Sequence, residues 1–396
     1  MVVWIVNPFD NLPLEGYRPQ RYWLMARAFA RAGHTVTLWT SDFSHALKAP
    51  RTFNDPHVVH DRKGFITADG FRLRLMPTRP YPTNICLRRI ASHRALARTW
   101  RKMAEAEATS PDVVIASTPP LSLCSAARRY CTAHHIPLVV DVMDAWPENF
   151  ERVVPRWFLA PLRRAARANY RAAAAITVVA DRYAELVKTY GAIAPIRLFH
   201  HGIEQPPSVP RPPSRDPATL TLAYAGNMGK SYDLATVIDT VKGMEGVRLE
   251  LAGTGPDEGR LRERAAGCDR ILFRGQLDDA GLRAMLAAGD AALIPMFDDA
   301  CVGVPYKLAD YAAAGLPILN TLRGETERLL EQFGVGITYA AGDAGALRAA
   351  LERLKAADRA KLSDGARQLA ERFDAARIYP AFVAFVEETA SARSLV

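Results

Sequence analysis

Length, composition and charge narrow the classes of protein to consider before any motif is examined. The chain of 396 residues is 49% hydrophobic and 23% charged, which suits two globular domains and excludes global disorder. Its five cysteines are odd in number and form no C-x-x-C pair, which argues against a disulfide framework or a zinc knuckle and favours a reducing cytoplasm. The net charge of +9 is uneven, because residues 1–198 carry 28 Lys and Arg against 15 Asp and Glu.

The first half of the chain alternates short apolar runs with helical periodicity, which is clearest over Tyr22–Arg31. Runs of Val and Ile bounded by Gly, Pro and Asp are typical of parallel strands buried on both faces. The predicted strands are Val2–Asn7, Val36–Thr40, Val113–Ser117, Leu138–Val142 and Ile176–Ala180. The less regular residues 44–85 are predicted to form an excursion. We expect neither a signal peptide nor a membrane span, which needs ~18–20 apolar residues.

A proline-rich segment separates the two halves of the chain. Six of the twelve residues from Pro206 to Pro217 are proline, which neither a helix nor a central strand tolerates. After it, strands are predicted at Thr219–Ala225, Val247–Ala252, Ile271–Arg274, Ala291–Pro295 and Pro317–Asn320. We therefore predict an N-terminal α/β domain over residues 1–205, a linker over 206–217 and a second α/β domain over 218–375. A last helix, Ala376–Glu388 within residues 376–396, is expected to pack back on the first domain.

The most informative motif is Pro305–Pro317, which reads P-Y-K-L-A-D-Y-A-A-A-G-L-P. Pro305 suits the first turn of a helix, and Gly315 suits its end. Lys307 and Asp310 lie three residues apart, so they share a face near the positive end of the helix dipole. A cation, a carboxylate and free amides at a helix N-terminus suit a phosphate-bearing sugar nucleotide, although an amphipathic helix with a surface ion pair would carry the same residues.

This motif resembles a helix of glycosyltransferase family 4, retaining enzymes of the GT-B fold, in which P-x-K-x-x-(E/D)-Y-x-A-x-G-x-P holds the donor nucleotide. Every fixed position of that pattern is filled here. The resemblance implies an α/β fold of two Rossmann-like doubly wound domains with a cleft between them. It places Lys307 on the diphosphate and Asp310 on the ribose, as catalytic residues. Where many members have a first glutamate, this chain has Val302; either Asp298 or Asp299 replaces it, or the donor sugar is less polar there.

Ligands of doubly wound sheets bind outside the carboxyl ends of the strands, so the loops at those ends are candidate donor contacts. Glycines and a lysine after Thr219–Ala225 predict a cradle for a pyrophosphate. The later Gly253-Thr-Gly255 is an incomplete dinucleotide fingerprint, since Glu258 takes its third glycine position, which disfavours a nicotinamide enzyme. Together with the resemblance, these loops predict donor contacts at Gly16, Arg21, Gly226, Asn227, Gly229, Lys230, Gly253, Gly255, Gln276, Leu277, Val304 and Pro305.

A carboxylate after the predicted strand Leu138–Val142 is the candidate for acceptor chemistry. The segment Asp144-Ala-Trp-Pro147 resembles the D-x-W-P element of family 4 members that transfer amino-deoxy sugars to lipid-linked acceptors. Asp144 could accept a proton from the acceptor hydroxyl or orient it. The alternative is that Asp144 caps the following helix, as aspartate often does.

Two arginine-rich segments hold much of the basic excess of the first half. The basic residues of the first segment cluster on one predicted helix, and those of the second interleave with apolar residues. Such segments are typical of helices that lie in a membrane interface, although two solvated helix faces would look the same. No homeodomain, RRM, KH or zinc-finger pattern indicates nucleic acid. The basic residues are Arg88, Arg89, Arg94, Arg98, Arg101 and Lys102 in one segment, and Arg152, Arg156, Arg163, Arg164, Arg167 and Arg171 in the other.

These patterns together predict a retaining glycosyltransferase that needs no metal or cofactor. It would move a sugar from a nucleoside-diphosphate donor, with a UDP-sugar favoured, to a membrane-associated glycan or polyprenyl-linked acceptor in surface-polysaccharide synthesis. The expected location is cytoplasmic and peripheral, on the inner face of the cytoplasmic membrane. The alternatives are a GT-B nucleotide-sugar epimerase and a non-catalytic, membrane-associated partner of a transferase.

Overall fold

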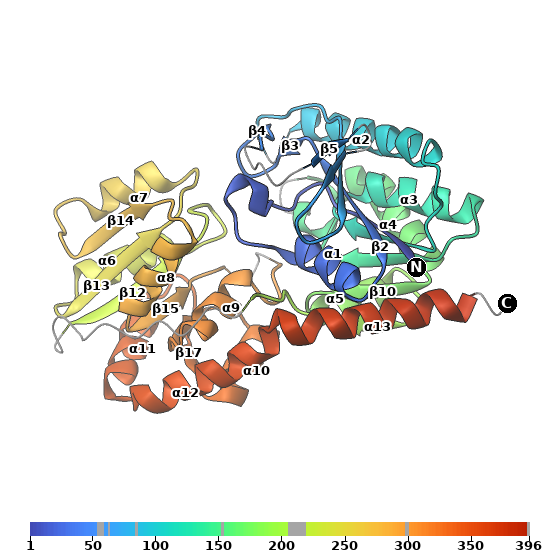
Figure 1. Cartoon of the computed structure of the whole chain (residues 1–396). Helices are drawn as coiled ribbons and strands as arrows, with labels where there is room; N and C mark the ends of the chain where they lie inside the picture. The colour runs from blue at the N-terminus through green and yellow to red at the C-terminus, as the bar shows by residue number, and fades with distance from the viewer. Residues whose placement is uncertain are drawn as a thin grey trace. The chain divides into compact units, whose positions relative to one another are not determined.

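The computed structural model describes residues 1–53, 59–61, 64–83, 86–151, 154–204, 219–297 and 301–393. The chain divides into two compact units (Figure 1), which are treated separately below. Unit 1 is Met1–Gly202 with Ala375–Val396, and unit 2 is Ile203–Asp374. The predicted linker over 206–217 lies outside the described residues, as do Asp298 and Asp299.

Unit 1 is built on one sheet in which the described strands follow the order β11-β10-β9-β8-β1-β2-β7-β6-β5. All neighbouring pairs are parallel except β5–β6 and β6–β7. The strand order reverses between β1 and β8, the point at which doubly wound sheets bind ligands. The strands are β1 (Val2–Val6), β2 (Thr35–Ser41), β5 (Val59–Asp61), β6 (Gly64–Ile66), β7 (Arg72–Met76), β8 (Val113–Thr118), β9 (Leu138–Val142), β10 (Ala175–Val178) and β11 (Ile196–Leu198), with a separate hairpin of β3 (Phe43–Ser44) and β4 (Ala49–Pro50).

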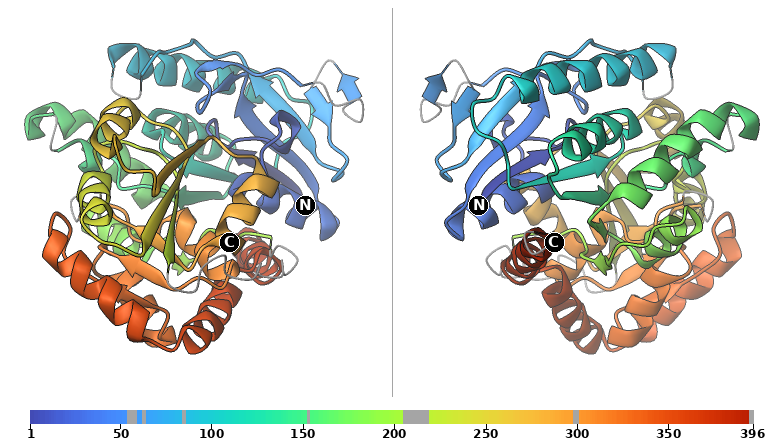
Figure 2. Two further views of the ribbon diagram at one scale, coloured as in Figure 1. Left: turned by 90° about the vertical axis from the view of Figure 1, so that its left-hand side faces the viewer. Right: turned by 90° about the vertical axis from the view of Figure 1, so that its right-hand side faces the viewer.

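Helices cover both faces of this sheet (Figure 2), because successive residues of β1 point to opposite sides. Trp4 packs on Tyr130 of α3, while Val3 and Ile5 join a core with α1 and α13. The helices are α1 (Arg21–Arg31), α2 (Leu87–Glu105), α3 (Leu121–Ala133), α4 (Ala160–Ala172), α5 (Asp181–Thr189) and α13 (Ala375–Arg393), with 3-10 turns η1 (Pro13–Glu15), η2 (Glu148–Phe150) and η3 (Arg156–Leu159).

The last helix, α13, returns to unit 1 and lies along α1 (Figure 1). The ring of Phe382 meets Phe29 of α1 edge to face, with centroids 6.4 Å apart, and also contacts Phe199. At the other end of the contact, His34 Nε2 lies 2.8 Å from Glu387 Oε1. Burial of these aromatic rings holds the C-terminal helix on the first unit.

Unit 2 contains a parallel sheet in which the described strands follow the order β14-β13-β12-β15-β16-β17. In chain order this is 3-2-1-4-5-6, the order of dinucleotide-binding sheets, and it reverses between β12 and β15. The strands are β12 (Leu220–Ala225), β13 (Val247–Ala252), β14 (Ile271–Gly275), β15 (Ala291–Ile294), β16 (Ile318–Asn320) and β17 (Gly336–Thr338). The helices are α6 (Leu234–Lys242), α7 (Glu258–Ala265), α8 (Asp279–Ala288), α9 (Tyr306–Ala313), α10 (Glu325–Phe333), α11 (Ala344–Ala356) and α12 (Arg359–Ala370), followed by the 3-10 turn η5 (Glu371–Phe373).

The predicted α/β fold of two Rossmann-like sheets is confirmed, and so is each predicted strand to within a few residues. Sequence analysis missed strands in the 44–85 region, of which β7 belongs to the parallel sheet. The reason is that β7 alternates arginine with leucine and so lacks an apolar run. Its Arg74 pairs with Glu107 at 3.0 Å and lies over the ring of Trp39. These contacts allow a charged side chain on a face of the sheet that is largely shielded from solvent.

Candidate functional site

The loops that follow β12 and β13 interlock at the carboxyl edge of the unit 2 sheet. A Cβ on Gly253, whose φ is +112°, would lie 2.0 Å from the carbonyl oxygen of Gly226. A Cβ on Gly255 would lie 2.3 Å from the carbonyl oxygen of Met228. Glycine is therefore required at both positions for the two backbones to approach each other.

This packing changes the role expected for two of the predicted glycines. The N–H of Gly226 donates to the carbonyl of Ala252 at 3.0 Å, and the N–H of Gly253 donates to the carbonyl of Gly275 at 2.7 Å. These amides are engaged within the protein, so they are not available to cradle a pyrophosphate as predicted. Gly226 and Gly253 instead shape the edge on which a ligand would rest.

The helix α9 brings its first turn to the same edge. Pro305 occupies the N-cap, one position earlier than predicted, and Gly315 follows the helix with a φ of +68°. Tyr311 fixes α9 to β12, because its hydroxyl accepts the N–H of Ala225 at 2.8 Å. The side chain of Lys307 is thereby directed at the loop after β12, where a Cβ on Gly226 would stand 2.8 Å from its Nζ.

The amine of Lys307 sits in a cage of two tyrosine rings. Its Nζ lies 4.1 Å from the ring centroid of Tyr224 and 4.3 Å from that of Tyr232. Lys307 is 8% exposed, and its Nζ has no hydrogen-bond partner among the described residues. Cation–π attraction offsets part of the cost of burying this amine but does not replace an anionic partner.

Burial lowers the pKa of Lys307 from 10.5 to about 7, against the opposing charge of Asp310, which raises it. An anion placed beside Nζ would restore the charged form. The amine also lies in the first turn of α9, where the helix dipole adds positive potential. This constellation is suited to an oxyanion such as the diphosphate of a nucleotide.

The other residues predicted on unit 2 lie on loops at or near the same edge. Asp310 is half-buried one turn after Lys307, and Val302 is half-buried before the helix. Asn227, Lys230 and Gln276 are exposed, Leu277 is half-buried, and Gly229, Val304 and Pro305 are buried. Sequence reasoning did not predict the contacts of Tyr224 and Tyr232 with Lys307. From sequence alone, an aromatic residue beside a strand is expected to belong to the hydrophobic core.

Arg21 has a different role from the predicted one. Its guanidinium is fully buried, with Nε 2.9 Å and Nη2 2.8 Å from the two carboxylate oxygens of Asp141. Nη1 donates to the carbonyls of Phe199 and His200 at 3.0 Å each. Burial alone would raise the pKa of Asp141, but Arg21 lowers it, helped by the hydroxyl of Thr177. Arg21 is thus a structural residue of the unit 1 core, whereas Gly16 is exposed on its loop.

Asp144 lies at the carboxyl edge of the unit 1 sheet, in the loop after β9. Its Oδ1 accepts the N–H of Ala145 and the side-chain amide of Asn149. The N-cap of the following 3-10 turn is Pro147, so Asp144 is not the cap of that turn. Burial raises the pKa of Asp144 despite these hydrogen bonds and the charge of Arg89.

Aromatic rings surround Arg89 beside this carboxylate. The guanidinium carbon lies 5.1 Å from the ring centroid of Trp146, 5.7 Å from that of Phe9 and 5.9 Å from that of Tyr81. His93 is 6% exposed, its Nε2 has no hydrogen-bond partner among the described residues, and burial lowers its pKa to about 3. The edge therefore offers stacking surfaces together with the guanidinium of Arg89 and the carboxylate of Asp144. Sequence reasoning did not single out Phe9 and Tyr81, which come from separate loops, or His93, which lies on α2.

Among the described residues, no group of three or more His, Cys, Asp or Glu side chains is placed to hold a metal ion. No helix in the same part of the chain has the length and apolar character needed to cross a bilayer.

Two family models match successive parts of the chain. The model described as glycosyltransferase family 4 matches residues 21–205, and the model described as glycosyl transferases group 1 matches residues 219–356. A phosphatidyl-myo-inositol mannosyltransferase of Mycobacterium leprae is 32% identical over 126 residues. That alignment covers 31% of this chain and 33% of the mannosyltransferase, so the chain matches about a third of the relative's length.

Solved structures of the same fold match nearly the whole length of the chain. Sucrose-phosphate synthase from Thermosynechococcus elongatus matches with a TM-score of 0.78 and 14% identity, over 99% of this chain and 100% of that one. Anabaena HepE, solved in complex with UDP-glucose, matches with a TM-score of 0.65 and 14% identity, over 98% and 100%. Identities this low establish the fold alone, which is GT-B. Since the two family models fall on the two Rossmann-like halves of this fold, the chain belongs to glycosyltransferase family 4.

Proposed function

We propose that the protein transfers a sugar from a nucleoside-diphosphate donor, with the donor bound at the edge of unit 2. The observation that carries this proposal is the unpartnered, buried amine of Lys307 in the first turn of α9. A diphosphate is the ligand that satisfies both the amine and the helix N-terminus. Asp310 would meet the ribose hydroxyls, and the exposed Lys230 would add a second cation without a metal.

The chemistry proposed for the transfer depends on stabilising the negative charge of the departing diphosphate. Stabilising the negative charge that develops on the leaving group accelerates bond cleavage, and Lys307 is placed for that task. The acceptor hydroxyl would attack from the face that the diphosphate leaves, which retains the configuration and needs no enzymic nucleophile. A UDP-sugar is favoured, as in the HepE complex with UDP-glucose.

The acceptor is proposed to bind at the carboxyl edge of the unit 1 sheet, where Asp144 could orient or deprotonate its hydroxyl. Rings such as Trp146 beside Arg89 suit a sugar stacked on an aromatic face with a phosphate nearby. We propose a membrane-associated glycan or polyprenyl-linked acceptor of surface-polysaccharide synthesis, and a peripheral location on the inner face of the cytoplasmic membrane. The similarity to a phosphatidyl-myo-inositol mannosyltransferase is consistent with a lipid-borne acceptor.

The donor proposal is tested by thermal shift and calorimetry with UDP-, GDP- and ADP-sugars. One class should stabilise the wild-type protein, since a ligand at 100 times its Kd adds about 2.7 kcal/mol. Lys307→Met should lose this stabilisation, whereas Lys361→Met, which removes an exposed lysine of α12, should keep it. A stabilisation that is equal in both variants would overturn the assignment of Lys307.

A nucleotide-sugar epimerase is the competing activity, and product analysis separates the two. A transferase releases the nucleoside diphosphate with the sugar joined to an acceptor, whereas an epimerase returns a nucleotide-sugar of altered configuration without any acceptor. Asp144→Asn should slow transfer and leave donor affinity unchanged, because Asp144 belongs to unit 1.

A further inference from the structure

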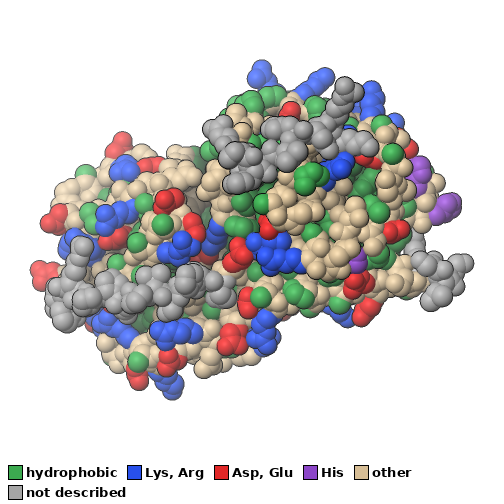
Figure 3. Space-filling model, viewed as in Figure 1, with side chains coloured by type: hydrophobic (Ala, Val, Ile, Leu, Met, Phe, Trp, Pro, Cys, Tyr) green, Lys and Arg blue, Asp and Glu red, His purple; other side chains and the backbone are tan. Residues whose placement is uncertain are grey.

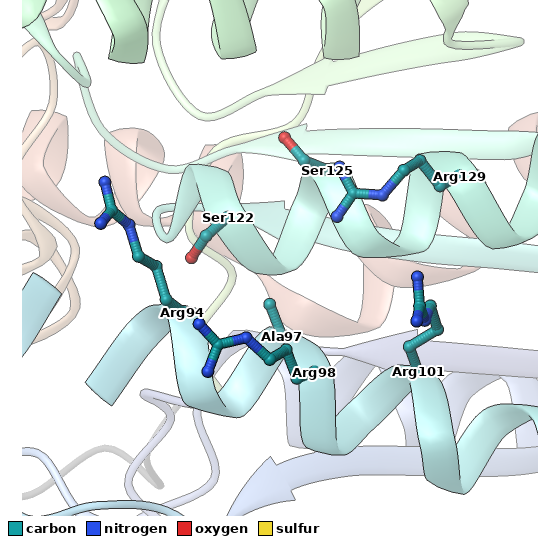
Figure 4. Close-up of a pocket in the computed structure, with 7 residues that line it drawn as sticks. All are labelled: Arg94, Ala97, Arg98, Arg101, Ser122, Ser125 and Arg129. Carbon is teal, nitrogen blue, oxygen red and sulfur yellow. The ribbon is translucent and has the colours of Figure 1, made fainter. Parts of the chain in front are cut away.

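A pocket between α2 and α3 of unit 1 is lined by four arginines, two serines and an alanine. Its volume is about 410 Å³, and Figure 4 shows three arginines on α2 facing Arg129 and two serines on α3. The lining residues are Arg94, Ala97, Arg98, Arg101, Ser122, Ser125 and Arg129. This pocket belongs to neither of the strand edges described above.

The sequence explains how the arginines converge. Arg94, Arg98 and Arg101 follow one another at spacings of four and three, which places them on one face of α2. Arg129 is on α3, which packs beside α2 along most of its length. Basic side chains are visible along the upper edge of the unit that carries α2 (Figure 3). Arg98 also lines a second hollow of about 380 Å³, together with Arg79 and Lys102.

The charge of this pocket is not balanced from within the protein. No ion pair joins any of its four arginines to an acidic residue among the described residues. By contrast, some exposed arginines elsewhere are paired, as Arg262 is with Glu258. Burial lowers the pKa of Arg129, and repulsion from Arg128 and Arg101 lowers it further. Like charges held together in this way stabilise a site for an anion and destabilise the empty protein.

The two serines do not supply free donors. The hydroxyl of Ser122 donates to the carbonyl of His93 at 3.0 Å, and that of Ser125 donates to the side-chain oxygen of Asn169 at 3.0 Å. The donors left for a ligand are therefore guanidinium forks. Such forks match the several oxygens of a phosphate and bind it through paired, charge-assisted hydrogen bonds.

We infer that the pocket between α2 and α3 is a second anion site, which binds a phosphate or diphosphate group. The group is either free or esterified to a lipid or glycan. The inference does not depend on the donor site of unit 2, since the residues, the helices and the unit are different.

Calorimetric titration with inorganic diphosphate tests the site on the full-length protein, with Lys307→Met in every variant so that the donor site does not add to the binding. The pocket variant is Arg98→Gln with Arg129→Gln, and the matched control is Arg31→Gln with Arg171→Gln, which removes the same charge from exposed positions of unit 1 outside the pocket. We expect the pocket variant to bind diphosphate at least about tenfold more weakly, and the control to stay within about twofold of Lys307→Met alone. Equal weakening in both variants, or none in the pocket variant, would overturn the inference.

Two further measurements keep the result unambiguous. Lys307→Met should retain the diphosphate binding that the pocket variant loses, which separates this site from the donor site. Thermal melts should show the pocket variant at least as stable as Lys307→Met alone, because removing like charges relieves repulsion, so a loss of binding cannot be ascribed to unfolding.

The source of the phosphate is identified by competition on the same site. Short-chain phosphatidylglycerol and glycerol phosphate share the phosphate group but differ in the lipid. Displacement of diphosphate by the lipid at much lower concentration identifies a lipid phosphate as the ligand. Equal displacement by both identifies a soluble phosphate group. Displacement by neither, in a protein that binds diphosphate normally, would contradict a site for esterified phosphates and restrict the pocket to free diphosphate.

Discussion

The buried amine of Lys307 is costly to the unliganded protein and useful to the liganded one. Taking an ammonium group out of water costs several kcal/mol unless a partner replaces the lost hydration. The tyrosine cage supplies only part of this, and Asp310 acts on Lys307 through its charge. The side chain is thus held ready for an anion at the expense of stability, which is a frequent feature of binding sites.

We expect Lys307→Met to stabilise the unliganded protein while it abolishes donor binding. Methionine fills a similar volume without a charge, so the free energy of unfolding at pH 6 should rise, on the order of 2 kcal/mol. Because the folded pKa of about 7 lies below the unfolded value of 10.5, the penalty is complete below pH 7 and disappears as the pH rises to 10.5. Urea denaturation at pH 6 and pH 10 measures the difference, and a less stable variant at pH 6 would contradict this account.

The same amine should make nucleotide binding depend on pH. Binding of a diphosphate raises the pKa of Lys307 above about 7, so the complex holds more protons than the free protein. Affinity should therefore fall as the pH rises above 7, by up to about tenfold per unit. Calorimetry in buffers of different ionisation enthalpy at pH 8.5 should detect proton uptake by the wild type. Lys307→Met serves as the control, and an equal uptake in both would exclude this lysine.

At the scale of elements, the interlocked loops after β12 and β13 make a sharp prediction about glycine. Gly253→Ala places a Cβ 2.0 Å from the carbonyl oxygen of Gly226 in a strained backbone region, so it should destabilise unit 2 by more than about 2 kcal/mol. Gly259→Ala, in α7 with nothing near its Cβ, should instead stabilise by about 0.5–1 kcal/mol. Denaturation curves of the two variants compare them directly, and similar small effects would disprove the close packing.

The connection of α1 to the sheet makes a second prediction at this scale. Arg21→Met leaves Asp141 buried without its partner and should cost about 3–5 kcal/mol. The surface pair of Arg262 and Glu258 is the comparison, and Arg262→Met should cost under about 1 kcal/mol. Calorimetry on folded Arg21→Met should find nucleotide affinity within about twofold of wild type. A large loss of affinity without a loss of stability would restore the role that sequence analysis predicted for Arg21.

At the scale of the whole molecule, the basic half and its exposed rings predict membrane binding. Trp157 and Phe158 of η3 are 70% and 55% exposed, and the neighbouring α4 carries the exposed Arg164 and Arg167. Each basic residue near an anionic surface contributes about 1 kcal/mol, and salt screens it. The structure refines the choice of variant, because Arg163 pairs with Glu151 and is a poorer probe.

We expect co-sedimentation with phosphatidylglycerol vesicles at low salt, little binding to neutral vesicles, and release at high salt. Trp157→Ser with Phe158→Ser should reduce the binding, and so should Arg164→Glu with Arg167→Glu. Ile193→Ser removes a side chain that is 89% exposed elsewhere in unit 1 and should leave binding intact. Equal recovery with neutral and anionic vesicles would contradict the electrostatic attraction on which this prediction depends.

The sequence by itself determined the fold class, the strands and the position of the motif with Lys307 and Asp310. These features are local: a run of Val and Ile makes a buried strand, and ligands gather where such strands end. Strands with alternating charge, such as β7, were missed because their polar residues are covered by residues distant in the chain, as Arg74 is by Glu107 and Trp39.

Only the tertiary structure decided which charged residues are available to a ligand. Arg21 and Lys307 are both cations near a strand edge in sequence, yet Arg21 meets Asp141 from 120 positions away. Lys307 meets two tyrosines and, in the part of the chain that the structure describes, no acid at hydrogen-bond distance. The arginines of α2 line a pocket with four guanidinium groups only because α3 brings Arg129 beside them. The physical reason is that desolvation and pairing depend on neighbours far apart in the chain, and residue type alone does not specify those neighbours.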